Sequence, residues 1–132
     1  MNTKTIEDIK QRVRDITFAE TFDLIVAIAN GGIIPAALLN QKLQAPVELL
    51  KVSFRDPGQK PLYDTPRLLQ PLSFDIAGKK ILLVEDRVKT GATLQLAVQL
   101  LAGAVLVKTF AVNGKADYAL YDEPCFRFPW LL

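Results

Sequence analysis

The chain has 132 residues, of which 50% are hydrophobic and 23% are charged. This length and composition are typical of one folded domain, 1–132, and not of a disordered segment. The net charge of +2 gives no field strong enough to favour a nucleic acid partner. The absence of histidine excludes a Ser-His-Asp triad and a histidine-ligated zinc site.

The cysteine content and the apolar segments bear on the cellular compartment. The single cysteine, Cys125, cannot form an intramolecular disulfide and is interpreted as an ordinary buried thiol. Residues 1–20 carry charges throughout and contain no apolar signal-peptide core. The nearly apolar stretch 93–107 is interrupted by polar residues and is too short to span a bilayer. We therefore expect a cytoplasmic protein without membrane contact.

Hydrophobic spacing predicts the elements of the first half of the chain. They are a helix over 5–16, a strand over 23–29, a helix over 35–43 and a strand over 47–54. Thr5 and Asp8 resemble a capping box at the start of the first helix. The continuous apolar run 23–29 is typical of a strand buried on both faces of a parallel sheet.

A polar stretch, 55–71, separates the two halves. It contains four prolines and no sustained period, which is typical of a functional lid or a disordered segment. After it we expect a turn over 77–80, a strand over 81–84, a polar loop over 85–90, a helix that buries Leu94, Ala97, Val98 and Leu101 and ends near Gly103, and a strand over 104–112. Asn113-Gly114 then predicts a turn into a tail.

The alternation of strands and helices predicts the fold class. It favours an α/β fold with a doubly wound, mainly parallel sheet flanked by helices. In such sheets a ligand binds at the carboxyl ends of the strands. Two loops, 30–32 and 85–93, are expected at that edge.

The second of these loops, Glu85 to Thr93, suggests a specific ligand. Two adjacent carboxylates at the end of a buried strand can accept hydrogen bonds from neighbouring ribose hydroxyls. Backbone N–H groups at the start of the following helix can bind an anion, and Gly91 lets the backbone approach a phosphate. Alternatively, the acids only end the strand and Thr90-Gly91 only begins the helix. The spacing favours a site for a ribose that bears a phosphate.

At this point the sequence resembles a known family. ILLVEDRVKTGAT, residues 81–93, is similar to the signature of the type I phosphoribosyltransferases. These enzymes take 5-phosphoribosyl-1-pyrophosphate (PRPP) with magnesium and displace the pyrophosphate with a nitrogenous base. DLIVAIANGG, residues 23–32, resembles the family's first strand and pyrophosphate loop, and KVSFRD, residues 51–56, resembles the start of the catalytic loop in the hypoxanthine, guanine and xanthine branch. FRFPW, residues 126–130, resembles the tail of that branch and implies a small C-terminal hood segment.

The resemblance implies roles for individual residues. The ribose hydroxyls would be bound by Glu85 and Asp86. The 5′-phosphate would be bound by Lys89, Thr90, Gly91, Ala92 and Thr93. Pyrophosphate would be contacted by Ala29, Asn30 and Gly31, with a glycine at 31 because the backbone needs unusual torsions. Magnesium would be held mostly by substrate oxygens and water, so no protein ligand is assigned to it.

The resemblance also implies catalytic and base-binding residues. The loop that begins at Ser53 and Phe54 would close over the site and exclude water from an oxocarbenium-like transition state. Lys89 stands where 6-oxopurine members usually have an aspartate that handles a proton of the base. The base would be contacted by Lys115 and Phe126.

Several of these assignments have alternatives. In one register Lys115 reads the purine O6, and in another, residues 115–118 match a Lys-Pro-Asp-Tyr segment further along the family's sequence. Cys125 stands at the position of the base-stacking aromatic, one residue before Phe126, while Phe126, Phe128 and Trp130 are equally compatible with packing in the core or in a dimer. Arg87 replaces an apolar residue and points either to the phosphate site or to a subunit contact.

The resemblance implies a phosphoribosyltransferase of purine salvage, with PRPP and a base as substrates, magnesium as cofactor and a homodimeric assembly. The alternative is a regulatory module that keeps the sugar-phosphate pocket but has lost the base chemistry. A Rossmann-type dinucleotide binder would need GxGxxG after a strand, and a P-loop protein would need Gly-Lys-Ser/Thr; the sequence contains neither.

Overall fold

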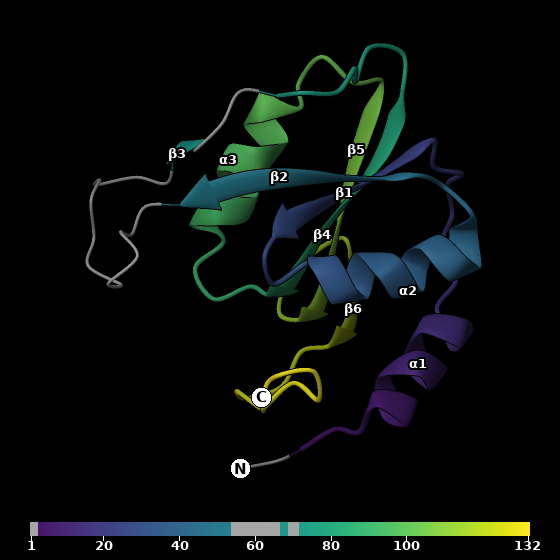
Figure 1. The fold of residues 1–132 in the computed structure, drawn as a ribbon, viewed down its shortest axis with the longest axis vertical. Coiled ribbons are helices and arrows are strands. Elements are labelled where there is room, and N and C mark those ends of the chain that lie inside the picture. Colours follow the sequence, from purple (N-terminus) through teal and green to yellow (C-terminus); the bar gives the residue numbers. More distant parts are fainter. Residues whose placement is uncertain (1–2, 54–66, 69–71) are drawn as a thin grey trace.

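A sheet with helices on both of its faces forms the described part of the chain (Figure 1), which in this computed structural model comprises residues 3–53, 67–68 and 72–132. The elements, in chain order, are α1 (Ile6–Asp15), β1 (Leu24–Ala29), α2 (Ile33–Leu43), β2 (Val47–Ser53), β3 (Arg67–Leu68), β4 (Lys80–Arg87), α3 (Ala92–Leu100), β5 (Leu106–Asn113) and β6 (Tyr118–Tyr121).

The strand order in the sheet is β3-β2-β1-β4-β5-β6. The strands β2, β1, β4, β5 and β6 run parallel, and β3 pairs antiparallel with β2. β1 and β4 are neighbours, with Ala27 opposite Val84, so the loops that follow them leave the same edge of the sheet. The predicted doubly wound, mainly parallel sheet is confirmed.

The two faces of the sheet have separate cores. On β1, Ile25 and Ala27 pack with the buried residues of α1 and α2, whereas Leu24, Val26 and Ile28 pack with those of α3. All five side chains are nearly or completely buried. Side chains alternate between faces along a strand, so helices on both faces explain why this strand is apolar without interruption.

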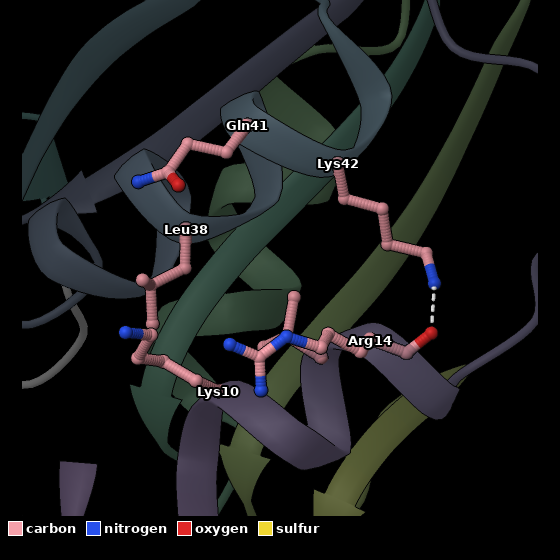
Figure 2. A pocket seen from close by; sticks show the side chains of 6 residues that line it. Lys10, Arg14, Leu38, Gln41 and Lys42 are labelled. Atoms are coloured by element: carbon pink, nitrogen blue, oxygen red, sulfur yellow. Dashed lines mark hydrogen bonds between the residues drawn. The ribbon is translucent and has the colours of Figure 1, made fainter. Parts of the chain in front are cut away.

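Both ends of α1 are fastened by side chains. The Thr5 hydroxyl accepts a hydrogen bond from the Asp8 N–H at 3.0 Å, and the Asp8 carboxylate accepts one from the Thr5 N–H at 2.9 Å, which confirms the capping box. At the other end, Lys42 Nζ of α2 donates to the carbonyls of Arg14 and Ile16 at 2.8 and 2.7 Å. Figure 2 shows the first of these two bonds.

Some element boundaries differ from the prediction. α2 begins at Ile33, which leaves Pro35 in its first turn as expected. β4 continues to Arg87 and does not end at residue 84, because Glu85 and Arg87 still pair with β5. The expected loop 55–71 lies outside the described residues except for β3.

β6 was not predicted from the sequence, and its residues were interpreted as tail. This strand has four residues, too few for a clear hydrophobic period. Its entry is fixed by Asp117, whose carboxylate accepts hydrogen bonds from the Thr109 N–H and hydroxyl at 2.9 and 3.1 Å. These bonds place β6 parallel to β5 after a short connection.

The residues after β6, 122–132, are called the C-terminal segment below. Phe126 and Phe128 are 0% and 1% exposed and belong to the core on the α1 and α2 face. The Trp130 ring stacks on Phe128, with ring centroids 4.9 Å apart. Arg127 forms a backbone bridge with Thr3, so the segment lies beside the start of the described chain. Among the described residues, no helix combines the length and hydropathy that a bilayer crossing needs.

Candidate functional site

Two loops meet at the carboxyl edge of the sheet. One follows β1 and contains Asn30, Gly31 and Gly32, and the other follows β4. A Cβ placed on Gly31 would lie 2.5 Å from Cγ of Asp86, so the two loops touch at this point. Gly31 is not among the glycines with positive φ, so a left-handed conformation is not the reason for a glycine here. The glycine is needed because the Asp86 carboxyl leaves no room for a side chain.

A hollow of about 320 Å³ lies beside the β4 loop. Its lining residues are Glu85, Arg87, Val88, Lys89, Thr90, Gly91, Ala92, Thr93 and Leu94. The structure thus brings together one of the predicted ribose-binding residues, Glu85, and all five predicted phosphate-binding residues, 89–93. The other acid, Asp86, lies against Gly31 in the neighbouring loop.

The start of α3 has the features of an anion site. Gly91 is its N-terminal cap and has φ of +85°, a left-handed conformation that favours glycine. The Thr90 hydroxyl accepts a hydrogen bond from the Ala92 N–H at 3.3 Å. The N–H groups of a helix's first turn lack intrahelical partners, and the first turn of α3 contains no acidic residue. Together with the helix dipole and the exposed Lys89, this geometry favours a phosphate group.

Glu85 has unusual electrostatics. The pKa of Glu85 is raised to about 8, chiefly by burial and then by the neighbouring Asp86 carboxyl, while the hydrogen bond from the Asp86 N–H acts in the opposite direction. Glu85 Oε1 accepts a hydrogen bond from the Asp86 N–H at 2.9 Å, and Asp86 Oδ1 accepts one from the Arg87 N–H at 2.6 Å. A protonated Glu85 can donate as well as accept a hydrogen bond, which suits a pair of hydroxyl groups.

Of the two alternatives considered for Arg87, the phosphate site fits its position, because the predicted phosphate-binding residues line the same hollow. The residue lines the hollow. Its guanidinium extends to the C-terminal segment, where Nη2 donates to the Phe126 carbonyl at 2.7 Å and Cζ lies 4.7 Å from the centre of the Phe128 ring.

The predicted base-binding residues do not line this hollow. Phe126 is completely buried and packs edge-to-face against Tyr121 and Phe128, so its ring offers no exposed face for a base to stack on. Phe126 is therefore a core residue, which was the alternative to base stacking. Lys115 is exposed on the connection between β5 and β6. Cys125 is exposed, which corrects the expectation of a buried thiol; it precedes Phe126, whose side chain enters the core instead.

The predicted catalytic loop is described only at its start. Ser53 is the last residue of β2, and Phe54 lies outside the described residues. Lys89, the remaining predicted catalytic residue, is in the loop that borders the hollow.

Magnesium is the cofactor that the sequence resemblance implies for this site. The described ranges contain no cluster of three or more His, Cys, Asp and Glu side chains that could hold an ion. Magnesium usually keeps several waters and binds phosphate oxygens of the substrate. The donor set therefore fits an ion held largely by a diphosphate ligand and water, with the carboxyl groups of Glu85 and Asp86 nearby.

Two residues at this edge were not identified as important from the sequence. Gly32 precedes α2, and a Cβ on it would lie 2.4 Å from the Val84 carbonyl oxygen. Asn113 is 4% exposed, and its side chain bonds both the N–H and the carbonyl of Glu123. The sequence carried a signal for Asn113 in the form of a polar residue that follows an apolar run, but that signal was interpreted as a turn.

A second hollow, of about 340 Å³, lies between α1 and α2 (Figure 2). Its basic residues already have partners within the protein. Lys42 caps the end of α1, Lys10 pairs with Glu7 at 3.2 Å, and Arg14 donates to Gln11. The hollow involves the second half of α2, and this helix runs away from the edge where the two loops meet. It is therefore a separate feature from the candidate site.

Comparisons with known proteins match this geometry. The model of the family described as "Phosphoribosyl transferase domain" matches residues 3–122. The chain is 34% identical over 80 residues to an orotate phosphoribosyltransferase of Sulfurisphaera tokodaii, an alignment that covers 61% of this chain and 36% of the relative. It is 32% identical over 111 residues to a xanthine-guanine phosphoribosyltransferase of Gluconobacter oxydans, which covers 82% of this chain and 65% of the relative.

A solved structure extends the likeness to nearly the whole fold. The purine phosphoribosyltransferase from Pyrococcus horikoshii superposes with a TM-score of 0.80 and 24% identity, over 98% of this chain and 93% of that one. By contrast, the chain spans 36% and 45% of the length of two orotate phosphoribosyltransferases that it matches.

Proposed function

Because this chain belongs to the phosphoribosyl transferase domain family, we propose that it transfers the 5-phosphoribosyl group of PRPP to a nitrogenous base and releases pyrophosphate. The observation that supports this most strongly is the hollow in which Glu85 and residues 89–93 come together at the start of α3. A carboxyl group at one end and free helix N–H groups at the other match the two ends of a ribose 5-phosphate.

Each part of the site has a role in this proposal. Glu85 and Asp86 accept hydrogen bonds from the ribose hydroxyls, and residues 89–93 bind the 5′-phosphate. Ala29, Asn30 and Gly31 contact the pyrophosphate, and their loop is adjacent because Gly31 abuts Asp86. Magnesium, when bound with the substrate, neutralises charge on the diphosphate leaving group. The sequence resemblance assigns the exclusion of water to the loop that begins at Ser53 and Phe54, of which Ser53 is the part that the structure describes.

We propose a purine as the base. The support for this choice is the resemblance of residues 51–56 and 126–130 to the hypoxanthine, guanine and xanthine branch. Alignment length does not separate the two kinds of base, since xanthine-guanine and orotate relatives each cover up to 85% of this chain. Relatives of both kinds exist, so the choice between a purine and orotate belongs to the experiment below.

A regulatory module that binds PRPP or a nucleotide without transferring the group is the second candidate. It is favoured by the burial of Phe126, which removes the aromatic expected to stack on the base, and by Lys89 in place of the aspartate expected in 6-oxopurine members. Neither feature removes the sugar-phosphate site, to which Lys89 itself belongs.

Assembly and location are further proposals. A homodimer is supported by large hydrophobic side chains that are exposed: Ile33 at 39%, Ile34 at 38%, Leu49 at 46% and Val105 at 68%. Burying such side chains against a second copy would remove apolar area from water. Light scattering on the purified protein tests this, and a cytoplasmic location stays a prediction.

The decisive experiment is pyrophosphate release from PRPP and magnesium, measured with hypoxanthine, guanine, xanthine, adenine, uracil and orotate in turn. We expect release that depends on one purine. Release only with orotate would overturn the choice of base but keep the reaction. If no base gives release and PRPP still raises the melting temperature, the regulatory module replaces the enzyme.

A further inference from the structure

Two neighbouring strand ends hold the C-terminal segment. Arg87 at the end of β4 and Asn113 at the end of β5 stand opposite each other in the parallel register. The Asn113 amide donates to the Glu123 carbonyl at 3.1 Å and accepts from the Glu123 N–H at 2.9 Å. Arg87 Nη2 donates to the Phe126 carbonyl at 2.7 Å. The backbone of the segment is thus fixed at two points.

Residues between these two points are turned toward solvent. Pro124 and Cys125 are exposed, whereas Phe126 is completely buried. The segment therefore forms a short arch anchored on the sheet edge. Figure 1 shows this part of the chain, in yellow, past the ends of β4 and β6.

The arginine at position 87 has a cost in this environment. Its Nε is buried and has no hydrogen-bond partner among the described residues. A buried polar group without a partner destabilises the folded state, and an apolar side chain at this position would avoid that penalty. Packing stability alone therefore does not explain an arginine at this position. The contacts of its other guanidinium atoms offer a different explanation.

Arg87 connects the hollow to the arch. It lines the hollow together with Glu85, and its guanidinium lies over the Phe128 ring while it binds the Phe126 carbonyl. A nucleotide with its ribose at Glu85 and its phosphate at residues 89–93 must direct its base out of the hollow. Because Arg87 both lines the hollow and bonds the arch, the arch is a surface that such a base could reach.

We propose that Arg87 is a positioning residue for the base: it sets the distance between the ribose-binding strand and the C-terminal segment against which the base lies. This inference rests on the proposed ribose-phosphate site. It assigns to Arg87 no contact with the reacting atoms. Its effect is therefore larger on the base half of the ligand than on the sugar-phosphate half.

The test compares ligands with and without a base. Calorimetry would measure the affinity of ribose 5-phosphate and of the 5′-monophosphates of guanosine, xanthosine and orotidine. For Arg87→Met we expect the best nucleotide to bind about tenfold more weakly, the scale of one lost charged hydrogen bond. Ribose 5-phosphate should keep its affinity within about twofold.

Two further variants separate positioning from general damage. Arg87→Lys retains a donor for the Phe126 carbonyl but cannot lie flat on the Phe128 ring, so we expect an intermediate loss. Arg127→Met is the matched control, because Arg127 is an exposed arginine of the same segment whose side chain bonds the Leu132 carbonyl. It should leave all affinities unchanged.

A readout without ligand comes from Trp130, the single tryptophan of the chain. Because Trp130 stacks on Phe128, its quenching by acrylamide reports whether the segment stays in place. We expect stronger quenching in Arg87→Met and no change in Arg127→Met. Unchanged quenching in Arg87→Met would overturn the proposal.

The binding outcomes distinguish this proposal from the proposed function. Equal losses for ribose 5-phosphate and nucleotide in Arg87→Met would overturn the positioning role, as would no loss in either. A wild-type protein that binds nucleotides no more tightly than ribose 5-phosphate would also overturn it. A wild-type protein that releases no pyrophosphate, but loses only nucleotide affinity on Arg87→Met, would contradict the enzyme and support the positioning residue.

Discussion

The loop after β1 and the loop after β4 both depend on glycine, but for different physical reasons. At Gly31 and Gly32 a Cβ would lie 2.5 Å from the Asp86 carboxyl and 2.4 Å from the Val84 carbonyl oxygen. At Gly91 the nearest atom to such a Cβ is Gln95 Nε2, at 3.9 Å, and the constraint is instead the φ of +85°. The first loop needs glycine for space, and the second needs it for its backbone conformation.

This difference predicts how each loop responds to substitution. At Gly32 the neighbours are packed backbone, which is rigid, whereas at Gly31 a methyl group must displace the Asp86 side chain. A torsional preference is local, and residues other than glycine can adopt it at moderate cost. We therefore expect the first loop to tolerate alanine much less well than the second.

Gly32→Ala should have the largest effect on stability. Its Cβ would press on the Val84 carbonyl oxygen and on the Ile28 backbone, at 2.9 and 3.0 Å, and neither can move freely. We expect a loss of roughly 3 kcal/mol or more in the free energy of unfolding, measured by denaturant titration. Gly103→Ala is the control, because its Cβ would meet Ile76 at an ordinary 3.6 Å. Similar losses in both variants would contradict the idea that space limits the first loop.

Asp86→Asn should weaken PRPP binding by roughly 1.5–3 kcal/mol, the scale for losing charged hydrogen bonds. Gly31→Ala displaces the same carboxyl group, so the two effects should not add in the double variant. Calorimetry with PRPP and magnesium measures both, with the exposed Asp15→Asn on α1 as control. Unchanged affinity in Asp86→Asn would place the pocket elsewhere.

Gly91→Ala should cost roughly 1–2 kcal/mol in the free energy of unfolding, because alanine in the left-handed conformation is strained. Gly91→Asn should cost less, since asparagine adopts this conformation more readily. Denaturant titrations of both variants provide the measurement. If the two losses are equal, the torsion does not explain the glycine and the comparison between the loops fails.

Glu85→Gln should change the pH dependence of stability by on the order of 1 kcal/mol. The pKa of Glu85 rises from 4.5 to about 8 on folding, so between these pH values the folded protein binds more protons than the unfolded chain. The contribution of Glu85 to the free energy of unfolding is therefore complete below pH 4.5 and declines as the pH rises toward about 8. Glutamine has no such titration, so the variant should gain stability relative to wild type as pH increases.

Thermal unfolding from about pH 5 to about pH 8 measures this difference. Glu48→Gln on β2 is the matched substitution of a second strand glutamate, measured in parallel. A constant gap between Glu85→Gln and wild type over this range would show that burial does not shift the titration of Glu85.

Much of the fold was predictable because local patterns and tertiary structure agree. The run 23–29 has the composition of a doubly buried strand, and β1 is covered by helices on both faces. The capping box of Thr5 and Asp8 acts within a single turn, so the sequence carries it completely. β6 has no such local signal, because it is held by Asp117 bonding back to Thr109.

The candidate site was predictable in one half only. Residues 85–93 form a continuous motif, and spacing along one loop and helix start places them together. The half of the site that would contact the base depends on which side chains of the C-terminal segment face the sheet. Phe126 was expected at the base, yet its ring fills the core, and Cys125 was expected to be buried, yet it is exposed.

The sequence by itself determined the layered α/β fold, the order of its main elements and the sugar-phosphate motif. Each of these follows from periodicity or from neighbours along the chain. Only the tertiary structure decided that Gly31 abuts Asp86, that Glu85 is buried enough to raise its pKa, and that Arg87 reaches Phe126. These features depend on distances between segments far apart in sequence, which packing of the whole sheet sets and no local pattern encodes.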